Sequence, residues 1–193
     1  MPEVSESTTK TFRQLEIARD LERIRFELTE SNVPIKFAQN FSGFSFEHII
    51  IPASSQGSQF DVPFFIAEIL HKRGMIEDFK SNFPLTLPEL EGAVRKEVRV
   101  GELQPLHQYF NILLLDHFLL MEEKESQFSE LEQKRQKTKF HQLINERISK
   151  IVKMTDSRKV LAQRKKNLTS SEQILFDKIV ELIQNWKTEF YQD

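Results

Sequence analysis

The amino-acid sequence predicts a mainly α-helical protein with a small N-terminal β unit, an α+β fold in which a helical bundle domain follows a small β domain. Three observations support this prediction. Apolar residues alternate with a period of two in parts of 31–62, recur at helical spacing along much of the remaining chain, and become nearly continuous in 105–121. We therefore expect an N-terminal extension at 1–30, a β domain at 31–62 and an α-helical domain at 63–193.

The N-terminal extension is predicted to contain an amphipathic helix over residues 11–28. Its apolar residues are separated by charged ones at intervals that place them on one side of a helix. These residues are Phe12, Leu15, Ala18, Leu21 and Leu28. The C-terminal end of this segment could instead begin the first strand of the β unit.

The β unit is predicted from a strand-like alternation between Val33 and Phe37. Residues 40–43 contain turn-forming side chains, residues 44–51 are rich in aromatic and β-branched residues, and residues 60–62 could form a last short strand. Two to four strands are expected. A sheet this small is marginal alone, so we expect the many nearby phenylalanines to supply its packing.

Two further helices are predicted from their end signals. The first begins with Pro63 in its opening turn and ends at Gly74, a typical C-cap residue. The second begins at Leu87 and continues to about Val100.

The last helix is predicted to follow the break at 167–169. Thr169 or Ser170 would be its N-cap, and Glu172 stands near the third position, as in a capping box. Its apolar residues continue to Phe190.

The stretch 105–121 predicts a central helix that begins at Pro105 and is apolar on nearly all sides. Such a helix must be covered on both sides, either by its own domain or by another protein. The stretch cannot span a bilayer, because that needs about 20 apolar residues and Asp116 and His117 interrupt it. We expect no membrane association.

The composition excludes several classes of protein. The 193 residues include no cysteine, so disulfides and thiolate metal sites are excluded, and the amino terminus has no apolar run that could be a secretory signal. An intracellular protein is expected. The net charge of −2 gives no general reason for nucleic-acid binding. The 17 phenylalanines are expected in cores and protein interfaces.

The sequence contains no recognisable catalytic or metal-binding motif. It has no nucleophile elbow, phosphate loop or dinucleotide glycine pattern, and its five histidines lack the spacing of a helical metal pair. Asp116 and His117 are the one adjacent pair that could act in acid–base catalysis, and loss of turnover on His117→Gln would support an enzyme. We expect no catalytic residue, cofactor or metal.

A basic stretch at 134–166 supports an alternative function. It contains 12 lysines and arginines but only two acidic residues. These cations could neutralise DNA phosphates. Solvated or protein-facing helices are also commonly basic, however, and no aromatic interleaving supports a stacking platform for single strands. The predicted contact residues for DNA or a partner are Lys159, Arg164, Lys165 and Lys166.

Several short motifs, in the same order along residues 31–190, resemble the GINS replication factors. The arrangement is similar to the archaeal small GINS subunit, in which the β domain precedes the α domain, and to the second and third eukaryotic subunits. The motifs are Asp61-Val-Pro-Phe-Phe-Ile-Ala67, Arg95-Lys-Glu97, Pro105 before Leu113-Leu-Leu-Asp-His117, Arg147-Ile-Ser-Lys150 and Asn167-Leu-Thr169. Val33-Pro-Ile-Lys-Phe37 and Gly43-Phe44 are closer to the third-subunit type.

The resemblance implies a non-catalytic subunit of a GINS complex, a helicase accessory factor of the replisome. Its partners would be a sister subunit with the opposite domain order in a heterotetramer, the MCM helicase and a RecJ-like replication factor, with DNA contact secondary. The protein would be cytoplasmic and nucleoid-associated in an archaeon, or nuclear in a eukaryote. Seven residues are predicted to belong either to the subunit interface or to the core of the chain, and the sequence does not tell which of the two each one joins. They are Phe64, Phe65, Tyr109, Phe110, Leu113, Leu114 and Phe118.

Overall fold

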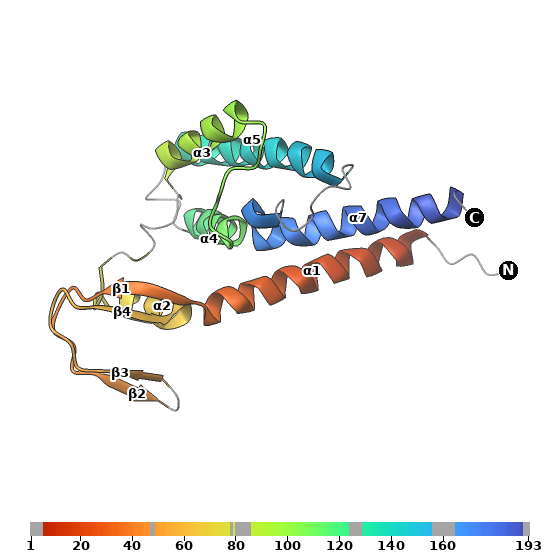
Figure 1. Cartoon of the computed structure of the whole chain (residues 1–193). Coiled ribbons are helices and arrows are strands. Elements are labelled where there is room, and N and C mark those ends of the chain that lie inside the picture. Colours follow the sequence, from red (N-terminus) through yellow and green to blue (C-terminus); the bar gives the residue numbers. More distant parts are fainter. Residues whose placement is uncertain are drawn as a thin grey trace. The chain divides into compact units, whose positions relative to one another are not determined.

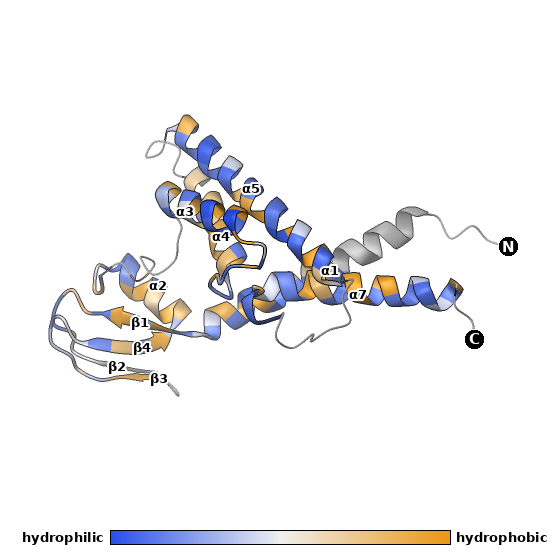
Figure 2. Ribbon diagram, turned by 45° about the horizontal axis from the view of Figure 1, so that its top comes forward, coloured by the Kyte–Doolittle hydropathy of each residue, from blue (hydrophilic) through white to orange (hydrophobic). Residues whose placement is uncertain are grey.

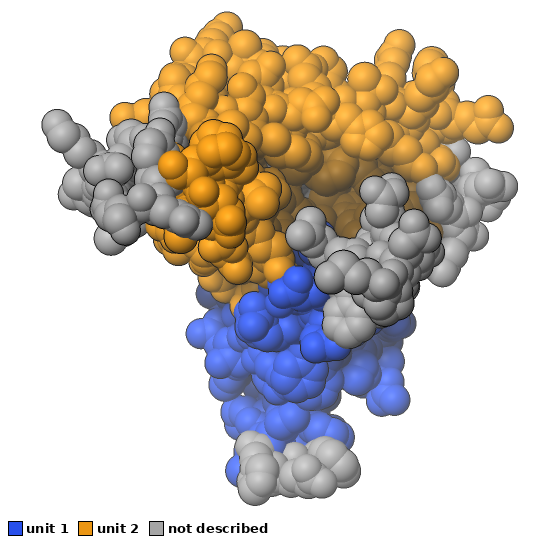
Figure 3. All heavy atoms as spheres, turned by 90° about the vertical axis from the view of Figure 1, so that its right-hand side faces the viewer, with its two compact units in different colours: residues 1–82 blue, residues 83–193 orange. Residues whose placement is uncertain are grey.

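The computed structural model describes the backbone of residues 6–46, 49–77, 79, 86–123, 129–155 and 165–190. The chain divides into two compact units, residues 1–82 and residues 83–193 (Figure 3). Helices dominate both units, and the described strands form short antiparallel ladders in the first unit (Figure 1). The predicted α+β fold, mainly helical with a small β region, is confirmed.

The first unit begins with helix α1 (Glu6–Glu30), so the helix expected at 11–28 is present and longer than predicted. Its C-terminal end does not become a strand. Helix α1 contacts α2 of the same unit, and Ile24 and Leu28 near its end are almost completely buried. Residues 6–30 are therefore part of the first unit rather than a separate extension.

The strands of the first unit form one long β-hairpin. The two residue numbers of each ladder pair, from Asn32 with Pro63 to Phe46 with Ile49, add up to 95. The bridge between Phe41 and Ser54 has the same register. The two ladders are therefore segments of a single hairpin. Its strands are β1 (Asn32–Lys36), β2 (Phe44–Phe46), β3 (Ile49–Ile51) and β4 (Gln59–Pro63).

The turn predicted at residues 40–43 is wrong, because the chain continues through this segment and reverses between Phe46 and Ile49. The turn-forming residues instead interact across the hairpin. The side-chain oxygen of Asn40 accepts a hydrogen bond from the backbone N–H of Gln56, and Gly43 has a positive φ of 90°. Asparagine and glycine tolerate such irregular backbone without forming a reversal.

The boundary between the units lies at residue 82 rather than at the expected position of 62. Helix α2 (Phe64–Lys72) contacts both β1 and β4, and Ile76 then pairs with Phe37 on the free edge of β1. The segment after the hairpin therefore completes the β unit. Pro63 ends β4 and caps α2, and Gly74 follows the helix with a φ of 68°, as expected for its end signal.

The regular secondary structure described in the second unit is all helical. The helices expected at 87–100 and after Thr169 are confirmed, and both begin with a capping box, formed by Thr86 with Glu89 and by Thr169 with Glu172. Its elements are α3 (Leu87–Arg99), α4 (Phe110–Glu123), α5 (Glu130–Thr155), the short 3₁₀ helix η2 (Lys165–Asn167) and α7 (Ser170–Phe190) (Figure 1).

The central helix α4 begins at Phe110, so the predicted start at Pro105 is wrong. In the segment between α3 and α4, backbone carbonyls accept hydrogen bonds from side chains of other elements. Lys150 donates to the carbonyls of residues 100 and 102, Asn167 to that of residue 103, and Arg147 to that of residue 104. These tertiary hydrogen bonds hold residues 100–104 in the connection between α3 and α4. Within the predicted first turn, the carbonyl of Gln108 accepts a hydrogen bond from the backbone N–H of Ser170 at 2.8 Å, and the N–H of Tyr109 donates to Nδ1 of His107. The segment before Phe110 therefore forms a turn instead of the start of the helix.

Candidate functional site

A cluster of four charged side chains connects α3, α5 and α7 inside the second unit. Glu97 is on α3, Arg147 and Lys150 are on α5, and Glu172 is in the first turn of α7. Arg147 is fully buried, Glu97 is 1% exposed and Glu172 is 5% exposed. Two positive and two negative side chains make the cluster neutral. We call these four residues the charge cluster.

All five N–H donors of the Arg147 guanidinium have an acceptor. Nε and Nη2 donate to the two carboxylate oxygens of Glu172 at 2.6 and 2.7 Å, and Nη1 donates to Glu97 at 2.9 Å. The remaining two hydrogen bonds go to the backbone carbonyls of Gln104 at 2.9 Å and Asn167 at 2.8 Å. An arginine can be buried when each donor is paired in this way.

Electrostatics in the cluster keep Arg147 charged. Burial alone would lower its pKa, but hydrogen bonds and charges from Glu172 and Glu97 outweigh this, and the pKa is raised above its ordinary value. The other carboxylate oxygen of Glu97 accepts a hydrogen bond from Lys150 at 2.6 Å. The side chains of the cluster are therefore paired with one another inside the second unit, and this geometry supports a structural role.

Three motifs that resemble GINS sequences meet at this cluster. Glu97 ends Arg95-Lys-Glu97, and Arg147 and Lys150 begin and end their own motif. Asn167 supplies a carbonyl to Arg147, and its side chain donates to the carbonyl of residue 103 at 2.8 Å. Glu97, Arg147, Lys150 and Asn167 of these motifs therefore serve the internal packing of the second unit.

Sequence reasoning missed the cluster, although a signal was present. On α5, Arg147 stands four residues from both Leu143 and Ile151, and all three side chains are fully buried. On α3, Glu97 continues the buried positions of Leu90 and Val94. A charged residue at an apolar position of a helix indicates a buried ion pair. Counting Arg147 only as part of a basic stretch obscured this pattern.

The residues predicted as interface or core are nearly all buried within the chain. Phe110 and Leu114 are completely inaccessible, and only Phe65 is half-buried rather than buried. Among the α4 side chains whose burial the structure describes, the exposed apolar ones are Leu115 and Leu119, at 44% and 49%. The remaining buried members are Phe64, Tyr109, Leu113 and Phe118.

Of the four predicted basic contact residues, the structure describes Lys165 and Lys166. Lys159 and Arg164 lie outside the described residues. Lys165 forms an ion pair with Asp177 at 2.6 Å and lies over the ring of Phe176, whereas Lys166 is exposed. Within the same basic stretch, Arg147 and Lys150 form ion pairs in the charge cluster. Fewer cations are therefore available to bind phosphates than the sequence indicated.

The described residues contain no group of three or more histidine, aspartate or glutamate side chains that could hold a metal ion. Asp116 and His117, the one pair considered for catalysis, are half-buried on α4. Burial lowers the pKa of His107 from its ordinary value, and its Nδ1 accepts a hydrogen bond from the N–H of Tyr109 at 3.3 Å. This contact stabilises the turn before α4.

The most exposed apolar surface of the second unit lies on the C-terminal half of α7. Leu182, Trp186 and Phe190 are 63%, 58% and 67% exposed. Each is four residues from the next, so they follow one side of the helix. The ring centroids of Trp186 and Phe190 are 4.5 Å apart. We call these three residues the α7 stripe; apolar residues recur along this helix in Figure 2.

Comparison of the chain with models of known protein families and with characterised proteins found no match. In the part of the chain that the structure describes, no helix combines the length and apolar character needed to cross a bilayer.

Proposed function

We propose that this chain is a non-catalytic subunit of a GINS-like complex that scaffolds and activates the replicative MCM helicase. The α7 stripe is the observation that most supports a function in protein assembly. Isolated exposed apolar residues are ordinary, but three large ones in a row on one helix, two of them aromatic, are typical of a binding surface. The sequence resemblance supplies the particular complex.

The area of the stripe indicates what kind of partner it needs. Aromatic side chains bury about 150–250 Å² each, so three residues exposed to about 60% offer roughly 300–400 Å². A stable interface needs about 800 Å² on each partner. The α7 stripe alone is therefore too small, and Leu115 and Leu119 of α4 are further apolar surface that a partner subunit could cover. This favours a multi-surface assembly over simple pairing of α7 helices.

The proposal is tested by co-expressing the chain with a sister GINS-type subunit from the same genome and sizing the assembly by chromatography with light scattering. Leu182→Glu together with Trp186→Glu is expected to abolish co-purification while leaving the helical circular dichroism unchanged, because both side chains are exposed. The matched control is Gln184→Glu with Thr188→Glu, which adds the same charge to the opposite, polar side of α7.

Three results would contradict the proposal. The first is that the stripe variant and its control co-purify equally with the sister subunit. The second is that the unchanged chain does not associate with the sister subunit at all. The third is that the unchanged chain is a stable monomer whose addition leaves MCM-dependent DNA unwinding unchanged. Loss of turnover of a substrate on His117→Gln, with an unchanged fold, would instead support an enzyme.

The alternative is a helical DNA-binding protein that uses residues 134–166. It has less support, because Arg147 is buried, Lys150 is paired with Glu97 and Lys165 is paired with Asp177. Reversing the charges of Lys159, Arg164, Lys165 and Lys166 distinguishes the two functions. Loss of DNA retention with subunit association intact would favour DNA binding, whereas no change in DNA retention would favour the assembly function.

A further inference from the structure

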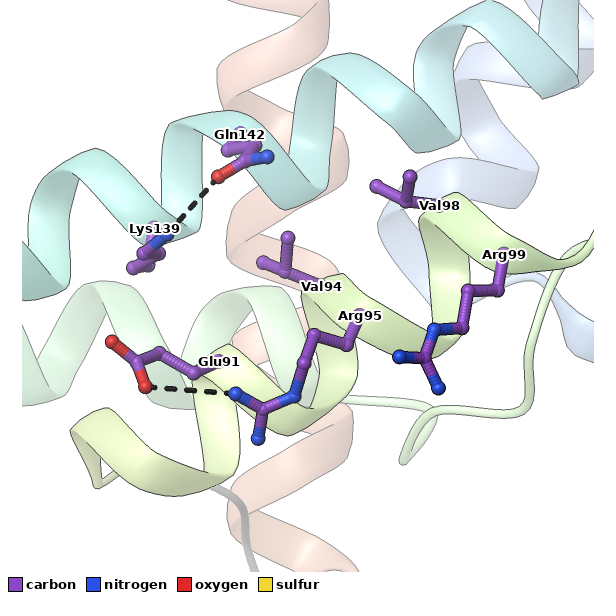
Figure 4. A pocket seen from close by; sticks show the side chains of 7 residues that line it. All are labelled: Glu91, Val94, Arg95, Val98, Arg99, Lys139 and Gln142. Carbon is purple, nitrogen blue, oxygen red and sulfur yellow. Dashed lines mark hydrogen bonds and ion pairs between the residues drawn. The ribbon is translucent and has the colours of Figure 1, made fainter.

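A basic groove lies between α3 and α5, on helices that the proposed assembly surface does not use. Figure 4 shows part of it, which is lined by Lys139 and Gln142 of α5 and by five residues of α3: Glu91, Val94, Arg95, Val98 and Arg99. This part encloses about 400 Å³. A second hollow of about 420 Å³ shares Glu91 and Lys139 with it, so the two are continuous; its other lining residues are Leu131, Lys134, Arg135 and Thr138. We call the combined surface the α3–α5 groove.

The charge of the groove is opposite to that of the whole chain. Five positive side chains and one negative side chain line it, a net charge of +4, whereas the chain has a net charge of −2. Arg95 forms a long, exposed ion pair with Glu91 at 3.8 Å. Arg99, Lys134 and Arg135 form no ion pair with any residue of the described chain. Most of the positive charge is therefore available to a ligand.

Two exposed apolar side chains distinguish this groove from a phosphate-binding surface. Val98 is 53% exposed in one hollow and Leu131 is 60% exposed in the other. Neither would gain from contact with a sugar–phosphate backbone, and the lining residues include no aromatic side chain on which bases could stack. A compact small molecule is also a poor fit, because such ligands are held by predominantly apolar pockets.

We propose that the α3–α5 groove binds an acidic peptide segment of another protein that also presents apolar side chains. Carboxylates of the peptide pair with Arg99, Lys139 and Arg135, and its apolar side chains contact Val98 and Leu131. The groove extends along α5 from Leu131 to Gln142, about 16 Å at 1.5 Å per residue, which matches a peptide helix of about 11 residues. Helices with one apolar and one charged face are commonly recognised in such grooves.

The test uses the full chain and a fluorescein-labelled peptide of about 12 residues in which leucines form one stripe of a helix and glutamates flank that stripe, so that both can reach the groove together. Binding measured by fluorescence anisotropy is expected to weaken as salt is added, because exposed charge pairs are screened. A second peptide, with every glutamate replaced by glutamine, is expected to bind at least about tenfold more weakly.

Two variants and a matched control identify the groove as the binding site. Arg99→Glu with Lys139→Glu is expected to weaken binding at least about tenfold. Lys153→Glu with Lys187→Glu changes the net charge equally at exposed positions outside the groove and is expected to leave binding nearly unchanged. Val98→Asn, at a half-exposed position that the fold does not need, is expected to weaken binding severalfold without changing the helix content.

The proposal is overturned if the groove variant and its control bind the peptide equally, or if the glutamine peptide binds as tightly as the acidic one. A third test uses a labelled single-stranded oligonucleotide of about 16 nucleotides. If it binds more tightly than the acidic peptide and loses affinity through Arg99→Glu with Lys139→Glu, the groove is a nucleic-acid site and the peptide proposal is wrong.

Discussion

Replacing Arg147 by methionine is expected to unfold the second unit at much lower denaturant concentration. The change removes five hydrogen bonds from a completely buried guanidinium and leaves the Glu97 and Glu172 carboxylates with less compensation. Breaking one partner of a buried ion pair costs about 3–5 kcal/mol. This loss is large, since folded domains have a free energy of unfolding of only about 5–15 kcal/mol.

The assay is urea denaturation followed by far-ultraviolet circular dichroism, with the free energy of unfolding compared between variants. The matched control is Arg95→Met on the same unit, where the arginine is 62% exposed and its ion pair with Glu91 is 3.8 Å long. Exposed pairs contribute at most about 1 kcal/mol, so the control is expected to change stability little. A loss on Arg147→Met no larger than that of the control would refute the reasoning.

A double-mutant cycle makes the test more specific. Glu172→Gln removes the charge that pairs with Arg147 and weakens the capping hydrogen bond to the N–H of Thr169. Because each single change leaves the other residue buried without its partner, Arg147→Met with Glu172→Gln is expected to cost less than the sum of the two single changes. Strict additivity would show that the two residues are not coupled as the geometry indicates.

Three further predictions follow from single positions. Burial lowers the pKa of His107 from 6.5, so the unfolded chain binds a proton more readily than the folded chain does. The contribution of His107 to the free energy of unfolding is therefore complete above pH 6.5 and decreases as the pH falls below it. His107→Gln should flatten this part of a profile of stability against pH. Gly43→Ala places a Cβ 3.0 Å from the Ala53 nitrogen at a φ of +90°, which strains the backbone by about 1–2 kcal/mol. Amide hydrogen exchange in the β2–β3 ladder should therefore become about 5–30-fold faster. Unchanged exchange rates would contradict this prediction. Leu114→Asp should lower the thermal unfolding midpoint strongly, whereas Leu119→Asp should change it little, because only Leu114 is completely buried; equal midpoints would count against the burial pattern.

Much of the fold could be predicted because its signals are local. The capping box of Thr169 and Glu172, the proline of α3 and the positive-φ glycine after α2 act within one turn of the helix ends that they define. The alternation from Val33 to Phe37 likewise predicted a strand with one buried face, and Val33, Ile35 and Phe37 are all buried. Such patterns depend only on neighbouring residues and on burial against some core.

The hairpin shows where local reasoning fails. Residues 40–43 have the composition of a turn, yet the chain crosses this segment because Phe41 pairs with Ser54 and Asn40 binds the backbone of Gln56. The partners are 13 and 16 residues away. A turn-forming residue only permits irregular backbone, whereas the pairing across the whole hairpin decides whether the chain reverses there.

The candidate surfaces were only partly readable from the sequence. The apolar excess of 105–121 was evident, but the sequence could not show that Leu113 and Leu114 are buried while Leu115 and Leu119 remain accessible. The α3–α5 groove was missed, because its cations come from two helices about 40 residues apart in the chain. Surfaces built from distant segments have no signature in either segment alone.

By itself, the sequence determined the helical and β segments, the absence of cysteine chemistry and the excess of apolar surface, because each depends on residue type and short-range spacing. Only the tertiary structure decided that Arg147 is buried in an internal ion pair rather than part of a basic surface, and that residues 105–109 stay outside helix α4. Both outcomes have the same physical cause. Buried charges and backbone carbonyls must find partners, and here those partners come from helices far apart in the sequence.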